Sequence, residues 1–298
     1  RQRRTVMFQQ IVNNGQVSAL GRAASQFTAG SAVNEWTNGY DYYCWLKRLT
    51  SETDLSGLYS QLAELSARVI GRRGLTVSVT GMHSEAVDDA ITVLVNARPE
   101  GGTVTGSGVA PRGVRREGIE IPSDVGYAAM GGLSGEFDGH WQLAGRVVSL
   151  EYLWNAVRVQ GGAYGTGMVT RINGFDGCYS YRDPSASKSL GTYAKAPEFL
   201  RGFADGVDSL DGLITGAISA SEPLLTPRAK GEEADDLYFR GITDDMRRDR
   251  RRQLLESTTS DLKRVADKIE RAFSEPGVSV LASRAELERC GLNEILSM

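Results

Sequence analysis

Leu153-Trp-Asn-Ala-Val-Arg-Val-Gln-Gly-Gly-Ala-Tyr-Gly165 is the stretch of sequence that decides the fold of this chain. Its apolar residues recur at helical spacing, and Arg158 stands near the end of that pattern. The pair Gly161-Gly162 then permits backbone angles that other residues avoid. Tyr164 opens the segment that follows, which has the composition of a strand. The sequence therefore predicts a helix that reverses directly into a strand.

The chemistry of this turn allows two interpretations. The guanidinium of Arg158 and the phenol of Tyr164 can hydrogen-bond the carbonyl oxygens of an extended peptide beside an accessible strand edge. Gly161 and Gly162 then belong to the same substrate-binding segment. Alternatively, Arg158 caps helix carbonyls and Tyr164 packs against its neighbours. Physical reasoning alone favours this second, structural interpretation.

Residues 117–298 are predicted to form one domain around this segment. A turn at Asn173-Gly174 joins two short strands, which indicates antiparallel pairing. A capping box is expected at Ser283 to Glu286, where serine and glutamate satisfy each other's free N–H groups. The expected strands are 118–122, 125–130, 164–172, 178–181 and 278–282, and the expected helices include 140–158 and one from 258. This order of elements indicates an α+β fold with a mainly antiparallel sheet and packed helices.

Residues 1–100 are expected to be the end of a homologous domain that is incomplete at its N-terminus. They are predicted to be helical up to residue 70, followed by an alternating strand at Leu75 to Thr80 and another helix. This strand has no credible neighbour, and a buried strand needs partners for its backbone groups. The missing strands are therefore expected from absent sequence or from another chain. Residues 101–116, rich in Gly, Pro and Arg, are typical of a linker.

Composition and charge are those of an ordinary globular protein. The chain has 298 residues, 41% of them hydrophobic, and a formal net charge of -3. We therefore expect neither nucleic acid nor membrane as a partner, since no apolar run approaches the roughly 20 residues of a membrane span. Three cysteines give no disulfide framework and favour a reducing intracellular compartment, either a bacterial cytoplasm or an organelle matrix. The first residue is Arg1 rather than methionine, and we expect the natural protein to begin earlier.

The sequence contains no recognisable metal site. Zinc peptidases use paired histidines and a glutamate, in H-E-x-x-H or in the inverted motif H-x-x-E-H. Neither motif occurs, and the two histidines, His83 and His140, lie in different predicted domains. We therefore expect this chain to bind no metal or other cofactor. The arginine cluster at 247–252 is flanked by acidic residues, which favours a solvated helix face over a phosphate-binding one.

Segment 153–165 resembles a signature of the pitrilysin/insulinase zinc metallopeptidases. Ser180-Tyr-Arg-Asp-Pro184, followed by Leu190 and Tyr193, resembles the branch that contains presequence protease and falcilysin. Further similarity to that branch lies at Ala23–Leu49, Gly241–Met246, Thr258–Leu262 and Val278–Val280. The resemblance therefore extends over nearly the whole chain.

The resemblance implies four homologous α+β domains in two halves that close around unfolded peptides. The amino-terminal half carries the H-x-x-E-H zinc site, and the other half supplies an arginine and a tyrosine that reach the substrate. Arg158 and Tyr164, which are 6 positions apart, match that pair.

The resemblance therefore implies that the chain is the non-zinc half of a zinc metalloendopeptidase that degrades unfolded peptides. Its partner would be an amino-terminal zinc-bearing half, upstream in the same polypeptide or in a separate chain, and zinc would be the cofactor of the complete enzyme. The isolated chain is expected to be inactive. The alternative is a catalytically inactive peptide-binding or assembly subunit of the same superfamily.

Overall fold

The structure is a computed structural model that describes residues 1–298 except 53, 83, 104, 105, 107 and 136. The chain separates into two compact units. The first unit contains residues 1–50, 109–222 and 248–298, and the second contains residues 51–108 and 223–247. In the first unit, residues 1–50 pack on the sheet formed by residues 116–297. Whether residues 1–100 descend from a third homologous domain stays a prediction.

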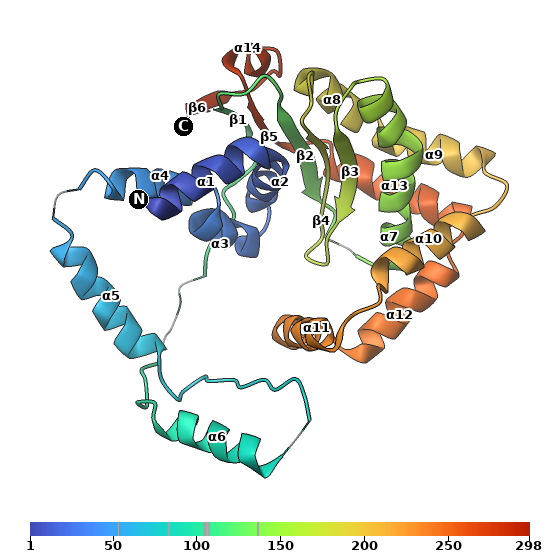
Figure 1. Ribbon diagram of the computed structural model, residues 1–298. Coiled ribbons are helices and arrows are strands. Elements are labelled where there is room, and N and C mark those ends of the chain that lie inside the picture. The colour runs from blue at the N-terminus through green and yellow to red at the C-terminus, as the bar shows by residue number, and fades with distance from the viewer. Residues whose placement is uncertain (53, 83, 104–105, 107, 136) are drawn as a thin grey trace. The chain divides into compact units, whose positions relative to one another are not determined.

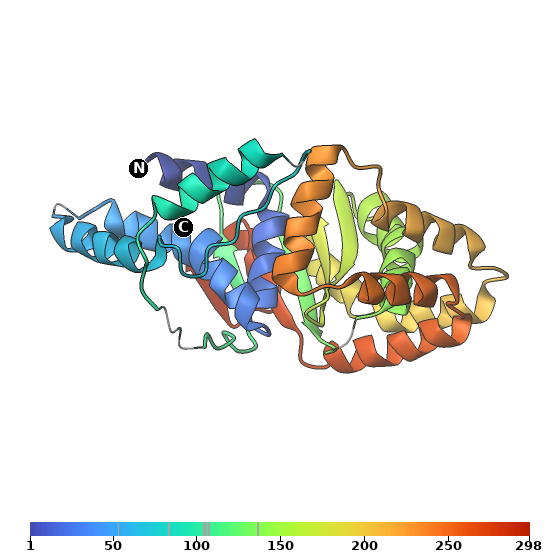
Figure 2. The same cartoon turned by 90° about the horizontal axis from the view of Figure 1, so that it is seen from below.

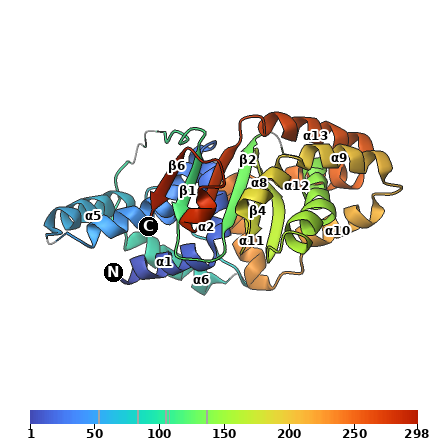
Figure 3. The same ribbon diagram turned by 90° about the horizontal axis from the view of Figure 1, so that it is seen from above.

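The described residues of the first unit form a six-stranded mixed sheet in the order β3-β4-β2-β5-β1-β6. The pairs β3–β4, β4–β2 and β2–β5 are antiparallel, whereas β5–β1 and β1–β6 are parallel. Figure 3 shows β6, β1, β2 and β4 following one another in that order. The strands are β1 (Arg116–Glu120), β2 (Tyr127–Leu133), β3 (Gly165–Thr170), β4 (Phe175–Tyr181), β5 (Gly277–Ala282) and β6 (Glu294–Ser297). The predicted α+β fold with a mainly antiparallel sheet is confirmed.

Helices cover both faces of this sheet, and each face has its own apolar core. Along the β3–β4 hairpin, Met168 and Cys178 belong to one core, while Val169 and Tyr179 pack against the other, as strand alternation requires. Figures 1 and 2 show the blue helices α1 to α4 grouped together on one side. They are α1 (Gln2–Asn13), α2 (Gly15–Ser25), α3 (Ala29–Asn38) and α4 (Tyr40–Leu49). The other core contains α7 (Gly139–Val147), η1 (Val148–Val159), α8 (Ala186–Tyr193), α9 (Ala196–Gly206), α10 (Asp211–Ser221), α12 (Asp244–Leu255), α13 (Thr259–Ala272) and α14 (Arg284–Leu287).

Helix starts follow side-chain capping, although one predicted cap is wrong. The side chain of Asp138 accepts a hydrogen bond from Trp141 N and begins α7. Thr258 and Asp261 form a reciprocal capping box at α13. The box predicted at Ser283 to Glu286 does not form. Glu286 instead accepts hydrogen bonds from the backbone N and the Oγ of Ser187, at the start of α8, because the fold brings these distant segments together.

The second unit contains α5 (Ser56–Val69), α6 (Glu85–Asn96) and α11 (Pro227–Arg240). No described segment forms a ladder with Leu75 to Thr80. The partners of the strand predicted there were expected from outside this chain, so the strand stays a prediction. An alternating pattern cannot become a paired strand without a neighbour that exchanges backbone hydrogen bonds. The apolar stripe of α5 is also solvent-exposed, with Leu62 at 51% and Leu65 at 53%. Among the described residues, no helix has both the length and the apolar character needed to cross a membrane.

A buried ion network fastens residues 1–50 to the sheet. Arg22 of α2 is only 2% exposed. Its guanidinium donates to Glu35 at 2.6 Å, to Asp41 at 2.9 Å and to Glu117 of β1 at 2.8 Å. Arg112 adds a second cation, 3.0 Å from Glu117. One side chain therefore links α2, α3, α4 and β1.

We expect Arg22→Leu to lower the free energy of unfolding by about 3–5 kcal/mol, because it leaves the carboxylates of Glu35 and Glu117 buried without this cation. Urea unfolding of the chain measures the effect. The control is Arg201→Leu, which removes a partly exposed cation paired with exposed Asp267 and Glu270 and should cost at most about 1 kcal/mol. An equal loss in both variants would contradict this account of the network.

Candidate functional site

The helix predicted at 140–158 is confirmed as α7 followed by η1, and it reverses into β3 at the glycine pair. Gly162 has φ +80° and donates its N–H to Arg158 O at 3.0 Å. A side chain at Gly161 would begin 2.5 Å from Val157 O, which is too close for any other residue. Both glycines therefore shape the turn, and direct contact between them and a substrate stays a prediction.

The turn brings Arg158 and Tyr164 together. The Arg158 Cζ lies 3.9 Å from the centroid of the Trp154 ring and 6.0 Å from that of Tyr164. Tyr164 is 68% exposed and meets Tyr181 edge to face, with ring centroids 5.6 Å apart. In the part of the chain that the structure describes, no helix carbonyl accepts a hydrogen bond from the Arg158 side chain. The interpretation of Arg158 as a helix cap therefore has no hydrogen bond to support it.

Arg158 and Tyr164 line a groove of 530 Å³ between α2 and the β3–β4 hairpin. Apolar and aromatic side chains make most of its surface, and two guanidinium groups, those of Arg158 and Arg171, provide its charge. None of the described residues that line it carries a carboxylate. The lining residues are Gln16, Val17, Leu20, Trp154, Arg158, Tyr164, Gly165, Thr166, Val169, Arg171, Tyr179 and Tyr181.

Two glycines in β3 leave the groove free of side chains at their positions. Gly165 and Gly167 alternate with Thr166 and share the face of Val169, which lies toward α2. A Cβ at Gly167 would lie 3.2 Å from the ring of Tyr179. Because these positions carry no side chain, the face of the hairpin stays open to a ligand that lies along the strand.

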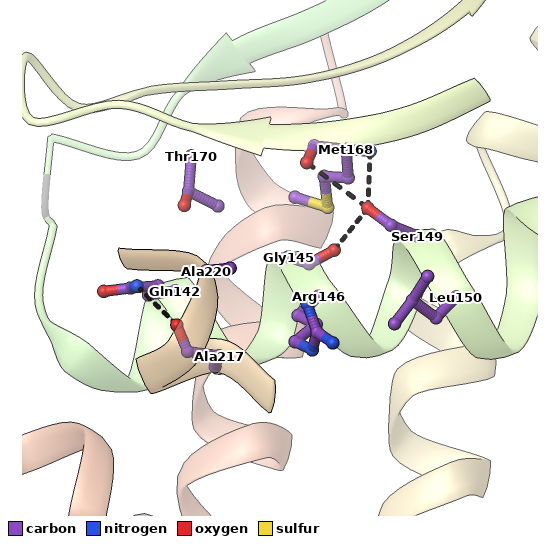
Figure 4. Close-up of a pocket in the computed structure, with 9 residues that line it drawn as sticks. All are labelled: Gln142, Gly145, Arg146, Ser149, Leu150, Met168, Thr170, Ala217 and Ala220. Atoms are coloured by element: carbon purple, nitrogen blue, oxygen red, sulfur yellow. Dashed lines mark hydrogen bonds between the residues drawn. The ribbon is translucent and has the colours of Figure 1, made fainter. Parts of the chain in front are cut away.

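A second, smaller pocket lies on the other side of β3, and its contacts show how accessible the outer edge of this strand is. It has a volume of 280 Å³ and is lined by residues of α7, η1, β3 and α10 (Figure 4). There the Ser149 Oγ accepts a hydrogen bond from Met168 N at 2.9 Å and donates to Gly145 O at 2.6 Å. Ser149 thus occupies the outer edge of β3 in the middle of the strand. The strand edge that the sequence predicts to be accessible is therefore partly closed, whereas the groove on the α2 side is open.

The described residues contain no arrangement that could hold a zinc ion. Within the described ranges, no group of three or more His, Cys, Asp or Glu side chains is placed to hold a metal. The His140 Nδ1 lies 2.9 Å from the Ser257 Oγ and takes part in the packing of α7 against α13. His83 lies outside the described residues. In the arginine cluster, Arg251 and Arg252 pair with Glu222 and Asp249.

Sequence reasoning missed part of this groove. Gln16, Val17 and Leu20 come from α2, about 150 residues before the turn, and no local pattern connects them with it. The sequence gives no signal at Val17, which has the helical spacing of a core residue with Leu20; only the structure shows that it is 67% exposed. Arg171 was also missed, although it directly follows the last residue of β3.

One buried carboxyl group lies in β4. Asp176 is 0% exposed, and its carboxyl oxygens have no hydrogen-bond partner of normal geometry within the described residues. Burial raises the pKa of Asp176 to about 8, while nearby Ser134 opposes this rise slightly. The group is therefore expected to be protonated and neutral at pH 7.

We expect Asp176→Asn to stabilise the chain most at pH 8. The unfolded carboxyl loses its proton near pH 4, so between about pH 4 and pH 8 the folded state holds more protons. Stability of the wild type should fall as pH rises through this window, by at most about 1.4 kcal/mol per pH unit. Thermal unfolding from pH 4 to 8 measures the effect, with exposed Asp208→Asn as the control. A stability gain that does not grow with pH would show that Asp176 is ionised in the folded state.

Comparison with known proteins identifies the family to which this chain belongs. Residues 116–284 match the family model described as the PreP C-terminal domain. The chain is 30% identical to presequence protease 1, chloroplastic/mitochondrial, of Arabidopsis thaliana, covering 96% of this chain and 27% of that protein. Its identity to the mitochondrial presequence protease of Saccharomyces cerevisiae is 26%, covering 91% of this chain and 29% of that protein. The crystal structure of pitrilysin has a TM-score of 0.50 at 15% identity, covering 73% of this chain and 26% of that one, and shows the shared fold.

The chain belongs to the presequence protease family and contains its C-terminal domain. It spans less than a third of the length of these two curated relatives.

Proposed function

We propose that this chain is the non-zinc half of a zinc metalloendopeptidase that degrades unfolded peptides. In this proposal it binds the peptide and stabilises the transition state. The observation that carries the proposal is the meeting of Arg158 and Tyr164 at a groove whose described lining contains no carboxylate. The relatives are named presequence proteases, which supports unfolded peptides as substrates.

Tyr164 has the exposure and the chemistry of a transition-state donor. Its phenol can donate a hydrogen bond to the scissile carbonyl oxygen as negative charge develops there, and a preorganised donor is worth most at that stage. The ring contact with Tyr181 holds the Tyr164 side chain at the mouth of the groove. The hydroxyl is thus accessible at the mouth of the groove.

Arg158 has the geometry of a peptide anchor. The guanidinium of Arg158 stacks on the ring of Trp154. This contact orients the guanidinium plane and leaves its N–H groups free to donate to carbonyl oxygens of a peptide. Cation–π stacking of this kind contributes about 0.5–2 kcal/mol and keeps the side chain ordered before substrate arrives. The family resemblance assigns the zinc chemistry to the amino-terminal half, which we propose as the partner of this chain.

We expect Tyr164→Phe to lower turnover by about 100- to 1000-fold in the protein that contains both halves, because one oxyanion donor is lost. Arg158→Ala should raise KM for the peptide, since it removes the anchor. Peptide cleavage and thermal unfolding should be measured on the same variants. Tyr238→Phe serves as the matched control, because Tyr238 is also exposed, at 70%, but does not line the groove.

Full activity in both groove variants would contradict the proposed site. A lower melting temperature with normal activity per folded molecule would instead support a purely structural role for the pair. Peptide binding without cleavage in the complete, zinc-loaded protein would favour the alternative of an inactive peptide-binding subunit.

A further inference from the structure

Arg171 occupies the far end of the groove and is rigidly placed. It follows Thr170, the last residue of β3, and begins the hairpin turn. Arg171 N donates to Phe175 O at 3.0 Å, and Gly174 N donates to Arg171 O at 2.8 Å. The guanidinium Cζ lies 5.6 Å from the centroid of the Phe175 ring. The charge is therefore held over an aromatic face at the end of the strand.

The cations of this groove lack counter-ions. Throughout the described ranges, neither Arg158 nor Arg171 has a carboxylate within ion-pair distance. Arg171 is partly buried, and this burial lowers the pKa of its guanidinium. A cation that is withdrawn from water without a partner is costly, and an anionic ligand group would remove much of that cost. The groove thus has the electrostatic character of a site that binds a carboxylate group.

The spacing of the two arginines matches an extended peptide. Arg158 contacts Tyr164 just before β3, and Arg171 comes just after its six residues. Six strand residues rise about 20 Å at 3.3 Å each, so a peptide of about six residues lying along β3 would reach from one guanidinium to the other. Between them lie Val169 and the side chains of Val17 and Leu20 from α2. The middle of the groove therefore suits apolar side chains.

Gln16 adds an unpartnered polar group to the groove. It lines the groove from α2, and its Oε1 is buried without a hydrogen-bond partner in the described structure. A buried amide oxygen left unsatisfied costs about 1–3 kcal/mol. A change of the Gln16 rotamer would turn this oxygen toward a backbone N–H of a peptide in the groove.

We infer that Arg171 recognises a carboxylate of the bound peptide at the hairpin end of the groove, while Arg158 and Tyr164 engage the peptide backbone at the other end. This inference rests on the proposed function, because it concerns the same groove. The carboxylate has two chemical sources, the C-terminus of the peptide and an Asp or Glu side chain. Arg171 would set which peptides bind and in which direction they lie.

The test uses calorimetric binding of three peptides to the chain. They share one apolar core of six residues and end in a free carboxylate, in an amide, or in a glutamate followed by an amide. The wild type should bind the free acid about 10- to 100-fold more tightly than the plain amide, because a charge-assisted hydrogen bond is worth about 1.5–3 kcal/mol. Arg171→Gln should remove this preference, and Arg171→Lys should keep part of it. The control is Arg284→Gln, because Arg284 is exposed and lies outside the groove.

Each outcome is informative. Tight binding of the glutamate peptide as well as the free acid assigns an acidic side chain as a ligand, and tight binding of the free acid alone assigns the C-terminus. Equal affinity of the wild type for acid and amide peptides overturns the inference and leaves the proposed function standing. Failure to bind any of the three peptides contradicts the proposed function itself. If Arg171→Gln still binds the free acid more tightly than the amide, another cation binds the carboxylate and the inference is wrong.

Discussion

The buried guanidinium of Arg22 is the constraint on which the candidate site depends. Its three carboxylate partners come from α3, α4 and β1, so a single charge fixes the first fifty residues against the sheet. Arg22 also lies over the ring of Tyr40, with its Cζ 5.0 Å from the centroid. A buried network of this kind gives little net stability over an apolar core, but breaking it is costly. It therefore acts mainly to specify one arrangement of α2.

That arrangement matters because α2 forms one wall of the groove. The other wall and the floor come from the end of η1 and from the β3–β4 hairpin. The glycine turn sets the position of Arg158 and Tyr164, the hairpin turn sets that of Arg171, and α2 supplies the apolar side opposite them. Two neighbouring turns and a helix about 150 residues earlier in the sequence thus make one elongated, cationic and largely apolar surface. Ser149 partly closes the outer edge of β3, whereas the groove face is open.

The sequence was sufficient for features that are encoded locally. The glycine pair and the spacing from Arg158 to Tyr164 predict the reversal, and Asn173-Gly174 predicts the hairpin. Features that depend on distant partners could not be predicted. Glu286 caps α8 rather than its own helix, and residues 1–50 join the sheet through ion pairs that leave no local pattern. The alternating segment at 75–80 looks like a strand, but pairing requires a neighbour that alternation alone does not provide.

Photo-crosslinking tests the central claim most directly, that a peptide lies in the groove between α2 and the hairpin. A six-residue peptide with a photoreactive group in its centre would be bound to the chain, irradiated and mapped by mass spectrometry. The account predicts labelling within α2 and β3, at residues such as Val17, Leu20 and Val169. Labelling confined to the pocket around Arg146 and Ser149, or to residues 51–108, would contradict it.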